Sequence, residues 1–182
     1  MPKKPQVQNS TAKTTTVPKD VRAINDQQGS SVGQERYILY RRARRRVKQA
    51  IKAGFYLEAV ALLESMISDR IESRTAQIHH QTKEKREFGN LSNLAKSLSG
   101  KDSKEPKEAK VIYEKVVFWA KFRNKTLHQM VKIAEKNEQG WEDRLAEAKQ
   151  TAIDGESLLT ELSSMVTSLN RKSQQDRKIN KD

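Results

Sequence analysis

Helix-breaking residues are rare through most of this chain, and this constrains the fold more than any other feature. Residues 34–169 contain one proline, Pro106, few glycines and no alternating run rich in β-branched or aromatic residues. Apolar residues recur there at the three-to-four-residue period of an amphipathic helix. We therefore expect an all-α domain at 34–169, a bundle of four or five helices. The flanking residues lack this period, which predicts a disordered polar arm at 1–33 and a flexible basic tail at 170–182.

The helix boundaries follow from the breakers and the apolar stripes. Gly54 is a typical residue just past a helix end, and Pro106 is typical of a helix start. Towards the C-terminus, Ile153 widens the apolar face that begins at Trp141. On the same segment Ala152 and Gly155 form a small-residue notch that allows a second helix to approach closely. The expected helices are 34–53, 55–77, 90–98, 107–134 and one from Trp141 to about 169.

The charge balance points to a partner that carries phosphates. There are 36 Lys and Arg against 23 Asp and Glu, a formal net charge of +13, of which six charges lie in the two flanking segments. The first helix holds eight cations and one acid, Glu35. We interpret it as a basic face for RNA, although such a run is also typical of a merely solvated face. The expected RNA-binding residues on it are Arg41, Arg42, Arg45, Arg46 and Lys48.

Several classes of protein are disfavoured by composition. The chain has no cysteine, so disulfides, thiol catalysis and Cys-ligated zinc are excluded, and a cytoplasmic location is expected. Apolar runs such as 59–63 fall far short of the roughly 20 residues needed to cross a membrane. There is no glycine-rich phosphate loop. The pair His79-His80 lacks partners at metal-ligand spacing, so we expect no metal and no cofactor.

The helix expected at 107–134 carries an arginine in the middle of its apolar stripe. Arg123 shares this stripe with Val116, Trp119 and Leu127, and a buried guanidinium is costly without a partner. Asn124 and His128 lie four residues apart and share a neighbouring face.

The second expected helix also carries arginines among its apolar residues. Arg70 and Arg74 project into its apolar arc, and Glu64 lies at the margin of that arc. Each arginine must reach water or pair with a carboxylate. Glu64 is therefore a candidate partner for a buried cation.

The segment Arg123-Asn124-Lys125-Thr126-Leu127-His128 resembles the Arg-x4-His motif of HEPN-domain proteins, in which a polar residue often follows the arginine. Arg74 and His79 have the same spacing but lack the Asn. The resemblance covers about residues 37–169 and includes the order of the helices. It implies a metal-independent endoribonuclease that acts as a homodimer with a composite active site. It also implies a role in toxin–antitoxin or anti-phage (abortive infection) defence, with an antitoxin or regulatory protein as a further partner.

The residue types suit that chemistry. RNA supplies its own nucleophile, the 2′-OH, so the enzyme needs a proton-transfer group and a cation that stabilises the reacting phosphate. A histidine such as His128 exchanges a proton near neutral pH. Arg123 grips a phosphate through two parallel N–H bonds, and Asn124 orients His128 or binds a phosphate oxygen. We expect Lys125 to contact RNA. The residues expected to support the site are Glu64 and Arg70.

Two other functions remain open on the sequence alone. One is a non-catalytic basic helical module that binds nucleic acid through the first helix. The other is an assembly or scaffolding protein whose charge serves solubility. In either case Arg123 would simply pair with Glu64 or Glu114, and His128 would be a surface histidine.

Overall fold

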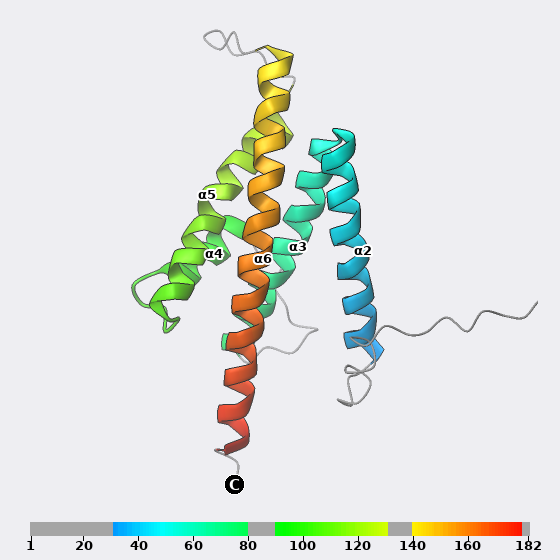
Figure 1. The fold of residues 1–182 in the computed structure, drawn as a ribbon. Helices are drawn as coiled ribbons and strands as arrows, with labels where there is room; N and C mark the ends of the chain where they lie inside the picture. The colour runs from blue at the N-terminus through cyan, green and yellow to red at the C-terminus, as the bar shows by residue number, and fades with distance from the viewer. Residues whose placement is uncertain (1–30, 80–89, 131–139, 180–182) are drawn as a thin grey trace, which may run out of the picture. The chain divides into compact units, whose positions relative to one another are not determined.

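The computed structural model describes residues 31–79, 90–130 and 140–179, and these residues form helices without any strand (Figure 1). The prediction of an all-α bundle is confirmed over these ranges. The predicted N-terminal arm lies outside the described residues except for its last three, which are helical. The helices are α2 (Ser31–Ala53), α3 (Tyr56–Ile78), α4 (Leu91–Ser99), α5 (Lys107–Gln129) and α6 (Trp141–Ile179).

The chain divides into two units within α2, between Tyr40 and Arg41. In the first unit the guanidinium of Arg36 lies 5.9 Å from the centre of the Tyr40 ring, a cation–π distance. The second unit contains the rest of α2 and all later helices.

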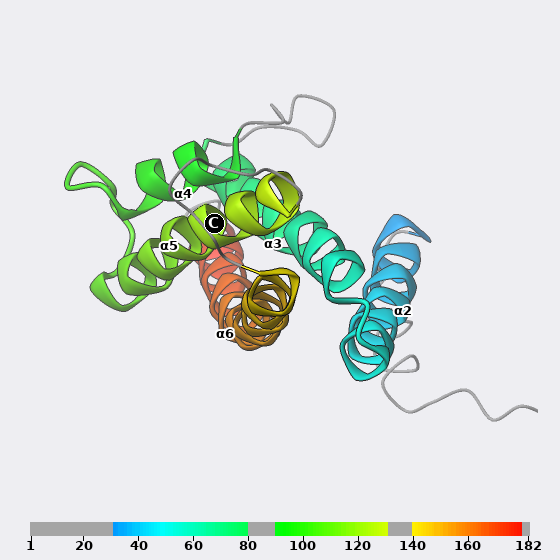
Figure 2. The same cartoon turned by 90° about the horizontal axis from the view of Figure 1, so that it is seen from above.

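The core of the second unit lies where α3, α5 and α6 pack against one another, with α4 against α5 and α3 (Figure 2). Apolar residues at helical spacing fill it, because each helix buries one stripe. Residues with 1% or less of their surface exposed include Val60, Leu63, Ile67, Ile71, Tyr113, Val116, Leu159 and Leu162. These are largely the stripe residues that the period predicts.

Local chemistry explains where the helices begin and end. Gly54 has φ +82°, the left-handed conformation that ends a helix and that glycine adopts without strain. The side chain of Asn90 accepts hydrogen bonds from the backbone N–H groups of Ser92 (2.9 Å) and Asn93 (3.4 Å), which caps α4. Pro106 stands directly before α5.

Helices α5 and α6 approach closely at the predicted notch. Trp119 is buried against Gly155, and a Cβ atom at Gly155 would lie only 2.8 Å from the indole Nε1. The same Nε1 donates a hydrogen bond of 2.9 Å to the carbonyl oxygen of Thr151. The absence of a side chain at residue 155 thus lets the indole ring seat on the backbone of α6.

Helix α6 differs from its prediction in two respects. It continues past residue 169 to Ile179, so its end does not coincide with the start of the predicted tail. Arg74 of α3 holds this extension by donating to Asn170 Oδ1 (3.0 Å) and Ser173 Oγ (3.3 Å). Ile153, expected on the buried face, is 41% exposed.

Two further points concern the reach of the helices. Helix α5 is described to Gln129, and residues 131–134 of the helix predicted at 107–134 lie outside the described residues. In the part of the chain that is described, none of the helices has both the length and the apolar character to cross a lipid bilayer.

Candidate functional site

Arg123 lies at the contact between α5 and α3. Its Nη2 is 2.5 Å from Oε1 of Glu64, and its Nη1 donates to Oδ1 of Asn124 at 2.7 Å. The Arg123 side chain is 13% exposed and that of Glu64 is 30% exposed. The Nε atom is buried with no hydrogen-bond partner among the described residues. Glu64 therefore holds the cation in the apolar stripe, and the polar edge of the guanidinium reaches the surface beside Asn124.

Asn124 and His128 lie on the exposed side of α5 near its C-terminus. They are four residues apart, which places both side chains on one face of the helix. Since Oδ1 of Asn124 accepts from Arg123, its amide nitrogen remains as the donor that points elsewhere. Within the described ranges, the His128 side chain has no hydrogen bond or ion pair. The structure thus brings Arg123 and Asn124 together and leaves His128 open to solvent one turn away.

Two other residues of the same segment face a different neighbour. Lys125 Nζ lies 2.8 Å from a carboxylate oxygen of Glu147 on α6. Thr126 is buried, and its hydroxyl is 3.2 Å from that of Thr151. Lys125, expected to contact RNA, is therefore engaged with an acidic residue, although both side chains are 41% exposed.

A buried polar cluster lies elsewhere on α3. Arg74 donates from Nε and Nη2 to the two carboxylate oxygens of Glu105, at 3.0 and 2.6 Å. Tyr113 donates its hydroxyl to Glu105 Oε2 at 2.6 Å. Burial opposes the charge of Arg74, but the bonds to Glu105 offset it and raise the pKa of this arginine. Burial first, and the bond to Glu105 second, raise the pKa of Tyr113 above its ordinary value.

The pairing of Arg74 with Glu105 could not be predicted from the sequence. The position of Arg74 in an apolar arc indicated that it needs a carboxylate, yet Glu105 stands 31 residues away in the connection before α5. No period or motif marks a loop residue as a partner. Arg70, expected to support the site, is half-buried on α3, and no described contact joins it to Arg123.

Only some of the basic residues of α2 are free of acidic partners in the described part of the chain and so available to bind phosphates. Arg46 is held by Glu58 through a bidentate pair at 2.5 and 3.0 Å, and Lys48 lies 3.7 Å from Glu156. Among the described residues, Arg41, Arg42 and Arg45 have no ion-pair partner, and all three are exposed. Arg41, Arg45, Lys48 and Lys52 recur at helical spacing on one stripe, with Arg42 beside it. We call these five residues the α2 basic face.

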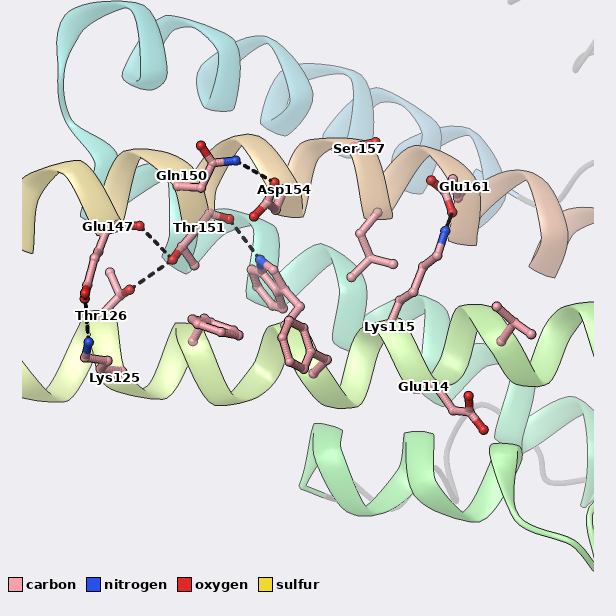
Figure 3. Close-up of a pocket in the computed structure, with 15 residues that line it drawn as sticks. Glu114, Lys115, Lys125, Thr126, Glu147, Gln150, Thr151, Asp154, Ser157 and Glu161 are labelled. Carbon is pink, nitrogen blue, oxygen red and sulfur yellow. Dashed lines mark hydrogen bonds and ion pairs between the residues drawn. The ribbon is translucent and has the colours of Figure 1, made fainter.

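A groove between α5 and α6 was not predicted. Its volume is about 770 Å³, and its lining comes from these two helices alone (Figure 3). Phe118 and Phe122 lie on its α5 side, 63% and 46% exposed, with ring centres 4.8 Å apart and planes tilted by 60°. Val111, 54% exposed, continues the stripe. Phe122 stands three residues after the buried Trp119, at the helical spacing of a core residue, yet its ring lies in the groove and not in the core.

Comparisons with known proteins do not indicate a function for this site. No protein-family model, curated protein or solved structure matches the chain. Within the described residues, no three His, Cys, Asp or Glu side chains gather as ligands for a metal ion.

Proposed function

We propose that this protein is a metal-independent endoribonuclease of the HEPN type, whose reaction centre is Arg123, Asn124 and His128. One observation carries the proposal: Glu64 and Asn124 hold the Arg123 guanidinium in place, and His128 is exposed one turn beyond Asn124. A fixed cation beside an open imidazole is what cleavage of RNA through its own 2′-OH requires.

The chemistry assigns each residue a task. Attack of the 2′-oxygen on the adjacent phosphorus breaks the bond to the 5′-oxygen and leaves a 2′,3′-cyclic phosphate and a 5′-OH. The proton lost by the 2′-OH must be accepted, and the leaving oxygen must receive one; imidazole does both near neutral pH. Arg123 and the amide N–H of Asn124 stabilise the charge that builds on the phosphate oxygens.

The ion pair with Glu64 sets a condition on this function. A phosphate can engage Arg123 only at the edge that Glu64 leaves open, or by displacing the carboxylate. A second copy of the chain would supply a second histidine and arginine, so that one group accepts the proton while another donates it. A homodimer with a composite site, acting in toxin–antitoxin or anti-phage defence and restrained by an antitoxin or other regulator, is therefore part of the proposal.

The test is cleavage of RNA by the purified chain in EDTA, with analysis of the product ends. We expect 2′,3′-cyclic phosphate termini, and we expect His128→Ala to stop cleavage without changing the melting temperature. His79→Ala is the matched control, because His79 is exposed and also stands five residues after an arginine. Equal cleavage by the wild type and His128→Ala would refute the proposal, as would loss of activity in His79→Ala alone.

A second candidate function is nucleic-acid binding without cleavage, favoured by the unpaired arginines of the α2 basic face. If it holds, His128→Ala binds RNA as the wild type does. Changing Arg41, Arg42 and Arg45 to Gln should then weaken binding and flatten its dependence on salt, since each phosphate contact releases counterions. No loss of RNA binding in this triple variant would exclude the α2 basic face as the binding surface.

A further inference from the structure

The groove between α5 and α6 has an apolar floor that the fold leaves uncovered. Phe118, Phe122 and Val111 project from one stripe of α5, and Leu158 of α6 lies at the base. Exposed aromatic residues that gather in one groove are typical of binding surfaces and rare elsewhere. This surface plays no part in the proposed cleavage chemistry.

The rim of the groove is acidic, in contrast to the chain as a whole. Four carboxylates and two lysines line it. Lys115 pairs with Glu161 at 2.7 Å and Lys125 pairs with Glu147. Among the described residues, Glu114 and Asp154 have no cation; Asp154 accepts only the amide of Gln150, at 2.8 Å (Figure 3). In a chain of net charge +13, these two acids leave the charged residues that line the groove with a net negative charge.

The walls also limit the form of the occupant. Both are helices, whose backbone N–H and C=O groups are already paired, so an extended peptide cannot add to them as a strand. From Val111 to Lys125 the groove follows α5 for about 21 Å, the length of some 14 helical residues. A third helix lying along two packed helices matches this shape.

We infer that the groove binds an amphipathic helix of a partner protein, with apolar residues one turn apart on Phe118 and Phe122 and Lys or Arg residues opposite Glu114 and Asp154. The unpaired carboxylates disfavour the phosphates of a nucleic acid. They also disfavour a second copy of the same groove, because acid would then face acid. An occupant would cover Lys125 and Thr126, two residues of the segment that ends at His128.

The probe is a synthetic helical peptide of about 18 residues, with Leu on one face and Lys on both flanks. Its twin carries Glu in place of Lys. Binding to the full chain is measured by fluorescence anisotropy at about 150 mM salt, where the Debye length of about 8 Å screens the distant charges. We expect the Lys peptide to bind at least about tenfold more tightly than the Glu twin, a difference of about 1.4 kcal/mol.

Variants locate the binding. Phe118→Ser with Phe122→Ser should weaken the Lys peptide by at least about tenfold, the effect of losing a central aromatic anchor. Phe55→Ser should leave it unchanged; Phe55 is the matched control because it is 61% exposed and lies at the start of α3. Glu114→Lys with Asp154→Lys should reverse the preference toward the Glu twin, and this readout does not depend on the aromatic residues.

Several results would overturn the inference. Equal binding of the two peptides would remove the charge argument, and an equal effect of Phe55→Ser would show non-specific adsorption. Self-association of the wild type that Phe118→Ser abolishes would assign the groove to a second copy. Loss of RNA binding in the same variant would assign it to base stacking. If the cleavage test fails and the peptide test succeeds, only the proposed ribonuclease activity is refuted, and the helix-binding groove stands.

Discussion

Removal of one buried hydroxyl group, in Tyr113→Phe, tests the cluster around Glu105. The Tyr113 side chain has no exposed surface, and its hydroxyl donates to Glu105 at 2.6 Å. A hydrogen bond to a charged group contributes about 1.5–3 kcal/mol, and the retained ring leaves no large cavity. With a urea m value of about 2 kcal/mol/M, the unfolding midpoint should fall by about 1 M at pH 7. A fall below about 0.25 M would refute the assigned strength of the bond.

The pH dependence of the same pair of proteins provides an independent measurement. Burial and the bond to Glu105 raise the pKa of Tyr113, whose ordinary value is 10.0. Above that pH the unfolded chain releases this proton and the folded chain keeps it, so the free energy of unfolding of the wild type falls by up to about 1.4 kcal/mol per pH unit. Phe cannot ionise, so the stability difference between the two proteins should narrow from pH 10 to 11. A constant difference would refute the raised pKa.

Three other substitutions have defined outcomes. Gly155→Ala should lower the melting temperature by a few degrees, because a Cβ atom only 2.8 Å from Trp119 Nε1 should cost about 2–3 kcal/mol in overpacking, more than the helix-propensity gain of about 1 kcal/mol; a rise would contradict the close approach. Glu64→Ala should cost about 1.5–3 kcal/mol in urea unfolding by leaving Arg123 without its carboxylate, and no change would mean that Arg123 reaches water. Asn90→Ala should lower hydrogen-exchange protection of α4 by about 0.5–2 kcal/mol, whereas protection equal to wild type would show that tertiary packing alone defines the helix start.

The helices and most of the core were predictable, because one apolar stripe per helix and breakers such as Gly54 and Pro106 act locally. The extent of α6 was not, since residues 170–179 are polar and have no apolar stripe. Their helix is an extension of one that is already nucleated, and contacts from Arg74 hold it. The prediction that Ile153 lies on the buried face was wrong, because this residue lies 100° around the helix from the buried Ala152.

The candidate site was predictable in part. The position of Arg123 among apolar residues indicated that it needs a partner, and Glu64 is that partner. The groove was not predictable, because exposed and buried aromatic residues at helical spacing look alike in a sequence. Phe118 and Phe122 became distinguishable only once the described neighbours of α5 were known.

The segment from residue 123 to 128 is anchored on two sides of α5. Arg123 binds α3 through Glu64, and Lys125 binds α6 through Glu147. Rotation of α5 about its axis would break both ion pairs, so together with the buried residues of α5 they hold the orientation in which His128 projects. A graft of these six residues onto another helix would therefore transfer the side chains but not the orientation in which they project. A designer who wished to transplant the site would need to carry Glu64 and Glu147 as well.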